Sequence, residues 1–255
     1  MLNIALVVPC LNDADLLARC LASFRAQTRP LDQIIVVDNG STDASAAVAA
    51  SFGAVVVGEP RRGITWAARA GYDAALAGGA DLIVRTDADA WASPTFVEEL
   101  VRQFALLIDA SAQRTSTSPV GLTGAATFDL PVGGALLARL YLGAYRASVG
   151  SALGHPPFFG TNCAFFARWW GEVRDAVDSA DTFVHDDIQL SFAVRPHETV
   201  LYAPQLSVCM DARALRGAAQ LRTRFRRGWY SMLRGFQTSP PPRRLLARWA
   251  GPREA

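Results

Sequence analysis

The chain has 255 residues, of which 51% are hydrophobic, and a formal net charge of +2 at pH 7. This length and apolar content suit one large α/β domain, or one domain with an appended lobe. No apolar run approaches the roughly 20 residues that cross a bilayer, which argues against a membrane-spanning helix. The sequence starts directly with its first expected strand, so we expect no secretory signal and a cytoplasmic protein.

The four cysteines argue against two further classes of protein. Cys10, Cys20, Cys163 and Cys209 are scattered along the chain and form no C-x-x-C pair. Neither a zinc site nor a disulfide framework is therefore expected. We interpret all four as buried thiols.

The first half of the chain alternates between strand and helix patterns. Strands are expected at 3–8, 33–37, 54–57 and 81–86, and helices at 13–27, 43–51, 64–77 and 94–109. Asp43 and Ser93 are the expected N-caps of two helices, with Pro94 in the first helical position. The order predicts an α/β fold with a mostly parallel, Rossmann-like central sheet and right-handed crossovers.

The second half is less regular. Its pattern predicts an apolar, small-residue segment at about 132–152, a strand at 162–167, a helix from 186 and strands near 199–209. A basic helix is expected after them. Residues 111–160 show no geometry that we can predict.

Acidic residues follow two of the buried strands at the point where each strand ends. Asp38 follows one apolar run, and Asp87 and Asp89 follow another. Ligands of α/β sheets bind at this edge. Two carboxylates one residue apart are hard oxygen donors, suited to a divalent cation such as Mn²⁺ or Mg²⁺ that holds a diphosphate. The chain is therefore predicted to bind a nucleotide diphosphate.

Five motifs occur in an order that resembles the family 2 glycosyltransferases, which have the GT-A nucleotide-sugar fold. They are Val7-Val8-Pro9-Cys10-Leu11-Asn12-Asp13, Val37-Asp38-Asn39-Gly40-Ser41-Thr42-Asp43, Thr86-Asp87-Ala88-Asp89, Gly160-Thr161-Asn162-Cys163-Ala164-Phe165-Phe166-Ala167-Arg168 and His185-Asp186-Asp187-Ile188-Gln189-Leu190-Ser191. A D-x-D triplet alone is a weak signal. Five motifs in family order, spread over residues 7–191, are a strong one.

The resemblance implies a donor site for a nucleotide-diphospho-sugar. It places the donor on Pro9, Leu11, Asp13, Asp38, Asp87, Ala88 and Asp89, with Asp13 standing where the family usually has Glu. Asp38 would accept a hydrogen bond from the nucleotide base, and Pro9 and Leu11 would form the floor beside it. Asp89 would bind the cation directly, and Asp87 would touch the ribose or a metal-bound water.

The resemblance also implies an inverting transfer to an acceptor hydroxyl. Asp187 is the implied general base and Asp186 its acidic neighbour, while Gly160 and Asn162 lie on the acceptor side. A carboxylate near another carboxylate and a metal can have its pKa tuned for such proton transfer. The alternative is that both acids only cap the helix that starts there.

Three arginines have two open interpretations each. Arg69 stands one position after the arginine of the family's "G-x-x-x-A-R-N-x-G" segment and either contacts the donor or pairs with a surface acid. Arg224 and Arg227 either close over the diphosphate or face solvent or lipid. The "Q-x-x-R-W" segment of processive synthases lacks its Gln in register here, so a non-processive enzyme is expected.

The C-terminal 45 residues are strongly basic. Residues 211–255 carry 11 of the 25 basic residues and only two acids, giving about +9 against about −7 for the rest. We therefore divide the chain into a GT-A domain at 1–210, with a nucleotide-binding half at 1–110 and an acceptor half at 111–210, and a basic helical extension at 211–255. Its arginines alternate with Trp229 and Phe236, as in helices that bind anionic lipid headgroups. A solvated helix with a core-facing apolar stripe is the open alternative.

Partners and competing functions follow from these features. The expected partners are a nucleotide-sugar donor, a hydroxyl acceptor that is lipid-linked if the basic helix meets the membrane, and no nucleic acid. A nucleotidyltransferase is the first alternative, but the first strand lacks a Gly-rich phosphate loop. A catalytically silent GT-A interaction module is the second, and the intact Asp87, Asp89 and Asp187 argue against it.

Overall fold

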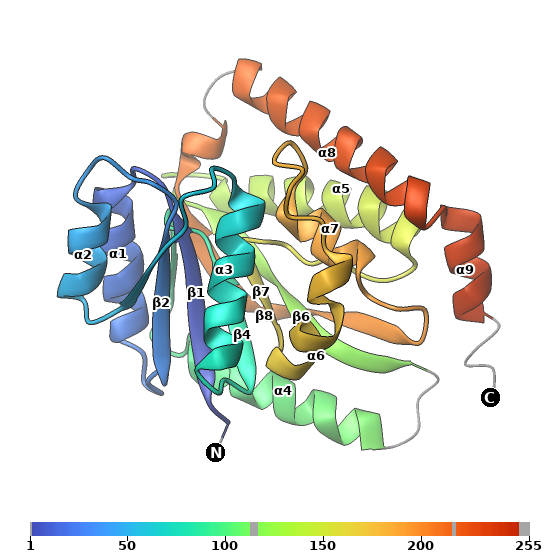
Figure 1. Cartoon of the computed structure of the whole chain (residues 1–255), viewed down its shortest axis with the longest axis horizontal. Helices are drawn as coiled ribbons and strands as arrows, with labels where there is room; N and C mark the ends of the chain where they lie inside the picture. Colours follow the sequence, from blue (N-terminus) through green and yellow to red (C-terminus); the bar gives the residue numbers. More distant parts are fainter. Residues whose placement is uncertain (1, 113–116, 216–217, 250–255) are drawn as a thin grey trace.

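A single mixed sheet forms the centre of the computed structural model, which describes residues 2–112, 117–215 and 218–249. Its strands are β1 (Ile4–Cys10), β2 (Gln33–Asp38), β3 (Val55–Gly58), β4 (Leu82–Thr86), β5 (Ala90–Ala92), β6 (Ser118–Phe128), β7 (Asn162–Phe166) and β8 (Glu198–Met210). The helices are α1 (Ala14–Arg25), α2 (Ser45–Ser51), α3 (Ile64–Ala77), α4 (Phe96–Ala112), α5 (Gly134–Leu153), α6 (Ala167–Val173), α7 (Asp186–Phe192), α8 (Ala218–Thr238) and α9 (Pro241–Trp249). Figure 1 shows helices on both faces of the sheet.

The strand order across the sheet is β3-β2-β1-β4-β7-β6-β8-β5. Strands β1 to β4 pair in parallel, and β7 then joins β4 in the antiparallel direction. β6 pairs in parallel with β8, and β5 adds to β8 in the antiparallel direction. The Rossmann-like α/β prediction is confirmed, with the parallel pairing concentrated in the N-terminal half.

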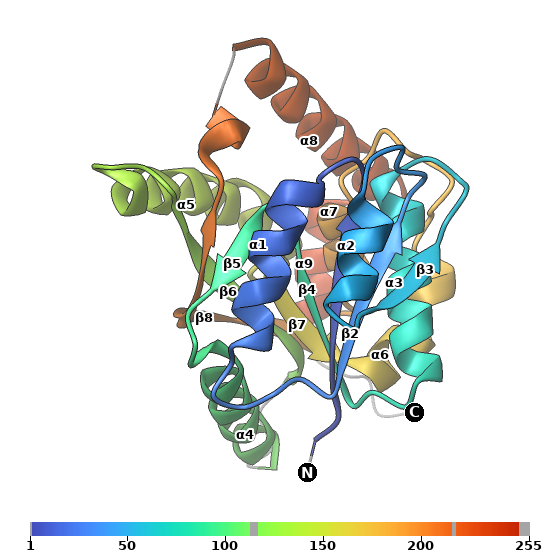
Figure 2. The same ribbon diagram turned by 90° about the vertical axis from the view of Figure 1, so that its left-hand side faces the viewer.

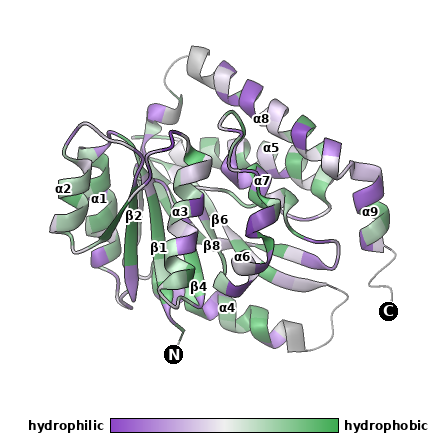
Figure 3. Ribbon diagram, viewed as in Figure 1, coloured by the Kyte–Doolittle hydropathy of each residue, from purple (hydrophilic) through white to green (hydrophobic). Residues whose placement is uncertain are grey.

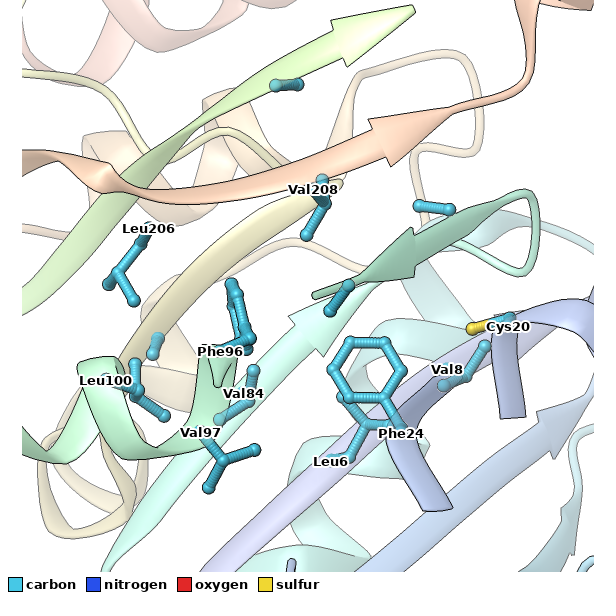
Figure 4. Close-up of a cluster of buried hydrophobic side chains, with 14 of the residues drawn as sticks. Leu6, Val8, Cys20, Phe24, Val84, Phe96, Val97, Leu100, Leu206 and Val208 are labelled. Carbon is cyan, nitrogen blue, oxygen red and sulfur yellow. The ribbon is translucent and has the colours of Figure 1, made fainter. Parts of the chain in front are cut away.

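Two apolar layers cover the sheet. The layer shown in Figure 4 packs Leu6 of β1 and Val84 of β4 against Phe24 of α1 and Phe96 of α4. The opposite layer packs α3 and α6 on the other face, where Tyr72 and Trp170 meet edge to face. Because both strands are buried on both faces, β1 is a continuous apolar run and β4 begins with one at residues 82–84.

The expected elements of the first half agree with the structure to within a few residues. Two helices begin two residues later than expected, α2 at Ser45 and α4 at Phe96, so the predictions of Asp43 and Ser93 as N-caps and of Pro94 as first helical residue were wrong. Pro94 lies in a turn instead, and the amide oxygen of Gln27 accepts a hydrogen bond from the backbone N–H of Val97 at 3.0 Å. A side chain from the segment after α1 therefore satisfies an orphan donor at the start of α4.

The structure also contains elements that the pattern did not predict. β5, β6 and α6 were missed, and the segment expected at 132–152 is α5. Cys10, Cys20 and Cys163 are buried as expected, whereas Cys209 is half-buried, and all four are free thiols.

The basic C-terminal segment packs on the rest of the molecule. Met232 of α8 lies in a small apolar cluster with Val149 and Leu153 of α5 and Ile188 of α7. Figure 3 shows hydrophilic residues at many positions along α8. Parts of the predicted extension, residues 216–217 and 250–255, lie outside the described residues, and its separation as a unit stays a prediction. Within the described ranges, no helix is both long and apolar enough to cross a bilayer.

Candidate active site

The loops that follow β1 and β2 are held together by side-chain hydrogen bonds. Asn12 adopts a left-handed conformation with φ of 53°, and its side-chain oxygen accepts the backbone N–H of Thr42 at 2.7 Å. Asp38, half-buried at the end of β2, accepts the backbone N–H of Ser41 at 2.9 Å. Beside them Pro9 is buried and Leu11 is 41% exposed. The predicted nucleotide floor thus lies at the carboxyl edge of the parallel strands.

Asp87, Ala88 and Asp89 form the tight connection between β4 and β5. Ala88 is buried, whereas the side chains of Asp87 and Asp89 are 34% and 17% exposed. Burial raises the pKa of Asp89, the nearby charge of Asp87 raises it further, and Arg213 opposes both effects. A pair of carboxylates this close favours a bound positive charge.

Arg213 supplies a positive charge at this point. Its Nε lies 2.9 Å from Asp89 Oδ2, and its Nη2 lies 2.5 Å from Asp13 Oδ2. Arg213 belongs to η2 (Ala212–Leu215), a turn of 3-10 helix directly after β8. Figure 2 shows this segment rising beside the start of α1. The guanidinium therefore links the ends of β1, β4 and β8.

The acidic pair of α7 lies next to the D-x-D turn. Asp187 is half-buried; its Oδ2 accepts the backbone N–H of Gly160 at 3.0 Å, and its Oδ1 accepts that of Ile188 at 2.8 Å. Asp186 is 13% exposed, and burial raises its pKa to about 6 against the opposing effect of Arg85. The two predicted halves of the site are therefore adjacent in space.

Arg85 of β4 connects these two halves. It is 3% exposed, with Nη1 2.9 Å from Asp87 Oδ1 and Nη2 3.2 Å from Asp186 Oδ2. The carboxylates hold the pKa of Arg85 well above its usual value, although burial acts in the opposite direction. Asp87 Oδ2 in turn accepts a 2.5 Å hydrogen bond from the hydroxyl of Thr161.

The donor set fits a divalent cation that takes its remaining ligands from a diphosphate and water. Asp87 and Asp89 offer carboxylate oxygens, and their mutual repulsion would be relieved by a cation. In the described ranges no group of three or more His, Cys, Asp or Glu side chains is placed to hold a metal ion. Protein ligands alone would therefore not complete the coordination of such an ion.

Other predicted site residues make contacts of a different kind. Arg69 pairs with Asp175 at 3.1 Å and donates to the carbonyl of Arg174 at 3.0 Å, on the outward side of α3. Arg227 donates to the carbonyls of residues 182–184, and Arg224 is exposed. Contact of these arginines with the donor stays a prediction.

Asn162, predicted for the acceptor side, is buried in the sheet. Its amide nitrogen donates to the carbonyl of Ala125 on β6 at 2.7 Å and to that of Leu206 on β8 at 2.9 Å. These bonds bridge two strands at a register shift between them. In this structure Asn162 therefore joins strands beside the site.

Sequence reasoning missed Arg85 and Arg213. A signal for Arg85 was available, because it is the one charged residue in the otherwise apolar run of β4, and an arginine buried in a sheet needs a carboxylate partner. No comparable signal marked Arg213. Its position depends on the pairing of β5 with β8, which brings Met210 beside Ala90.

Residues 5–115 match the model of one protein family, described as glycosyl transferase family 2. The matched segment contains the β1 and β2 loops and the D-x-D turn described above. This part of the chain, somewhat less than half of it, is similar to glycosyl transferase family 2.

Sequence relatives are consistent with family 2. A protein of Mycobacterium tuberculosis, named as an uncharacterized glycosyltransferase, is 44% identical over 86 residues. That match covers 34% of this chain and 36% of the relative, so the chain spans about a third of the length of the curated relatives it matches.

Solved structures share the family 2 fold at low sequence identity. A mannosyltransferase of Pyrobaculum calidifontis, solved with GDP-Man and Mn²⁺, is 19% identical with a TM-score of 0.66, over 97% of this chain and 69% of that one. A glucosyl-3-phosphoglycerate synthase of M. tuberculosis, solved with Mn²⁺, UDP and its glucosylated product, is 21% identical with a TM-score of 0.54, over 92% and 80%. These similarities show the GT-A fold.

Proposed function

We propose that this chain transfers a sugar from a nucleotide-diphospho-sugar to an acceptor hydroxyl, with inversion at the anomeric carbon and in a single, non-processive step. The observation that carries the proposal is the adjacency of the D-x-D carboxylates to Asp187, linked through Arg85 and Gly160. A donor diphosphate and an acceptor hydroxyl would then meet at one edge of the sheet. The match of residues 5–115 to family 2 and the neighbours solved with Mn²⁺ support the same chemistry.

The donor side is assigned to the ends of β1, β2 and β4. Asp38 would accept from the nucleotide base, with Pro9 and Leu11 beneath the base, and Asp87 and Asp89 would hold Mn²⁺ or Mg²⁺. The cation, when bound, stabilises negative charge on the leaving diphosphate. Arg213, which pairs with Asp89 and Asp13, would add a second positive charge beside the diphosphate.

The acceptor side is assigned to Asp187. The backbone N–H groups of Gly160 and Ile188 fix its carboxylate, leaving its outward lone pairs for the acceptor hydroxyl. The acceptor oxygen bonds to the anomeric carbon as the bond from that carbon to the diphosphate breaks. The hydroxyl proton passes to Asp187, and the electron pair of the broken bond leaves with the nucleoside diphosphate.

A donor panel tests the activity directly. Purified protein is assayed for sugar release from a panel of nucleotide-sugars, with and without Mn²⁺, beside Asp89→Asn and EDTA controls. We expect one donor to be hydrolysed or transferred only with the cation, and Asp89→Asn to weaken nucleoside diphosphate binding without changing the melting temperature. Equal nucleotide affinity in the wild type, in Asp89→Asn and in the wild type with EDTA would contradict the assignment of Asp89 to the metal.

We also infer that the acceptor side meets an anionic membrane surface, where a lipid-linked acceptor presents its hydroxyl. On α8 the exposed side chains of Phe225, Trp229 and Leu233 recur every four residues, so they share one side of the helix. Arg222 and Arg226 are exposed on the same turns. Apolar side chains among arginines suit reversible binding to anionic headgroups, at about 1 kcal/mol per arginine.

Liposome co-sedimentation tests this part separately. Binding should rise with the anionic lipid fraction and fall with salt, and the double change Arg222→Gln/Arg226→Gln should weaken it. A matched control, Arg25→Gln/Arg102→Gln, removes two exposed arginines of α1 and α4 and should leave binding unchanged. Protein that stays in the supernatant with anionic vesicles at low salt would point to a water-soluble acceptor.

A further inference from the structure

We propose that Arg85 is a positioning residue for the transfer reaction, which fixes the D-x-D carboxylate and the general base relative to each other. The proposal rests on the proposed function, because it assigns Arg85 a part in that same site. It concerns a residue of β4 whose side chain is buried beneath the loop at 160–161.

Six residues, Arg85 among them, form a closed ring. Its guanidinium contacts Asp87 at 2.9 Å and Asp186 at 3.2 Å. From Asp87 the ring continues through the 2.5 Å hydrogen bond donated by Thr161 and the adjoining Gly160. The N–H of Gly160 donates to Asp187 at 3.0 Å, and the chain then leads back to Asp186. The arginine thus closes the ring through two ion pairs, and the other links are backbone or hydrogen bonds.

The packing at Gly160 shows that the loop lies directly on the guanidinium. A Cβ atom at position 160 would lie 2.5 Å from Arg85 Nη1 and 3.3 Å from the Cβ of Asp187. A side chain here would therefore push the arginine or the base out of place. Only a glycine allows the backbone N–H to reach Asp187 while the loop rests on Arg85.

The contacts of Arg85 are ionic rather than ordinary hydrogen bonds. Nε and Nη1 are buried and donate no hydrogen bond to any atom of the described chain, and Asp186 Oδ2 accepts none. A buried cation and buried carboxylates stabilise each other only while both are present. Arg85 is thus the counter-charge of Asp87 and of Asp186, the neighbour of the proposed base, and it reaches the two with separate nitrogens.

The first test separates positioning from general stability. Arg85→Met should lower kcat on the order of 10²-fold, as a displacement of about 1 Å of a reacting group does, while the KM for the donor changes by less than about threefold. Arg85→Lys keeps the charge but reaches one carboxylate, so it should recover melting temperature and not kcat. The matched control Arg195→Met also removes an arginine shared by two carboxylates, Glu172 and Glu198, and should lower melting temperature without lowering kcat.

A second variant keeps the test valid if Arg85→Met does not fold. Thr161→Val is nearly isosteric and breaks the ring between Thr161 and Asp87 without burying or removing a charge. We expect a loss of kcat of about tenfold, with little change in melting temperature. Recovery of full kcat in Arg85→Lys, or a loss of kcat and donor affinity in equal measure, would overturn the proposal.

The last measurement needs no turnover. In the metal-free protein, amide hydrogen exchange at Gly160 should quicken in Arg85→Met and stay unchanged in Arg195→Met. If the wild type transfers no sugar, the proposed function is wrong, but exchange at Gly160 still tests whether Arg85 holds the ring together. Unchanged exchange at Gly160 in Arg85→Met would show that Arg85 does not hold the base in place.

Discussion

Asp187 and its acidic neighbour have distinct surroundings despite being adjacent in the chain. Asp187 is held by two backbone N–H groups, whereas Asp186 faces Arg85 and has a pKa raised by burial to about 6. Different surroundings of paired carboxylates separate their roles in catalysis. Asp187 is the better placed of the two to accept a proton, and Asp186 completes the charge balance around Arg85.

The Asp187→Asn variant is expected to bind donor normally and to lose transfer. An asparagine keeps the size of the side chain but cannot take the proton, so transfer should fall by at least about 10²-fold. Nucleoside diphosphate affinity measured by calorimetry is the control and should match the wild type. Near-normal turnover, or a product with the donor's own anomeric configuration, would contradict the assignment.

Arg213 is predicted to compete with the cation. Since its guanidinium pairs with Asp89, a metal ion must displace that ion pair to bind. In Arg213→Gln the affinity for Mn²⁺ without nucleotide should therefore rise, by about tenfold or less for the loss of a half-exposed pair. Binding of Mn²⁺ is followed by calorimetry, with Arg234→Gln, an arginine paired with Asp181, as control. A weaker affinity in Arg213→Gln would mean that the arginine supports the metal instead.

At the scale of elements, α9 is attached to the body of the molecule by a buried arginine. Arg244 is 4% exposed and donates to the carbonyls of Leu153 at 3.0 Å and Val194 at 2.5 Å. Its Nη2 also lies 3.1 Å from Nε2 of His155, whose Nδ1 lies 2.8 Å from the carbonyl of Pro156. His155 must therefore keep Nε2 unprotonated to accept from Arg244.

This contact predicts acid-sensitive stability. Burial lowers the pKa of His155 to about 3, and the charges of Arg244 and Arg248 oppose protonation as well. The unfolded chain binds the proton first, so stability falls as pH drops from about 6.5 towards 3. Between pH 6.5 and 5 the free energy of unfolding should fall by about 2 kcal/mol at most from this effect. Urea unfolding should show a smaller pH dependence in His155→Gln than in wild type, and equal dependence would exclude His155 as the cause.

At the scale of the whole molecule, the basic C-terminal part and the catalytic part share packing. Met232 and Arg244 both contact residues near the ends of α5 and α7, and α7 carries the acidic pair. Removal of α8 and α9 would uncover Val149, Leu153 and Ile188. A chain that ended at the predicted boundary, residue 210, would therefore expose an apolar surface.

Truncation after Leu215 is thus expected to destabilise the remaining chain. It keeps Arg213 at the donor site but exposes an apolar cluster, so the melting temperature should fall by several degrees and Asp187 should lose support from behind α7. The comparison is a thermal melt of both forms with donor binding as a second readout. An unchanged melting temperature would support an independent C-terminal extension.

The sequence by itself determined the α/β fold and the similarity to family 2, and it placed acids at the ends of the parallel strands, because those properties depend on local patterns. Buried parallel strands are rich in consecutive apolar residues, and acids at their carboxyl ends indicate a ligand site. The roles of Asp38, Asp89 and Asp187 stay predictions. Only the tertiary structure decided that Arg85 joins Asp87 to Asp186, that Arg213 reaches Asp89 and that Asn162 bridges strands. These contacts join residues up to 124 positions apart through the register of β4, β7 and β8, which no local pattern encodes.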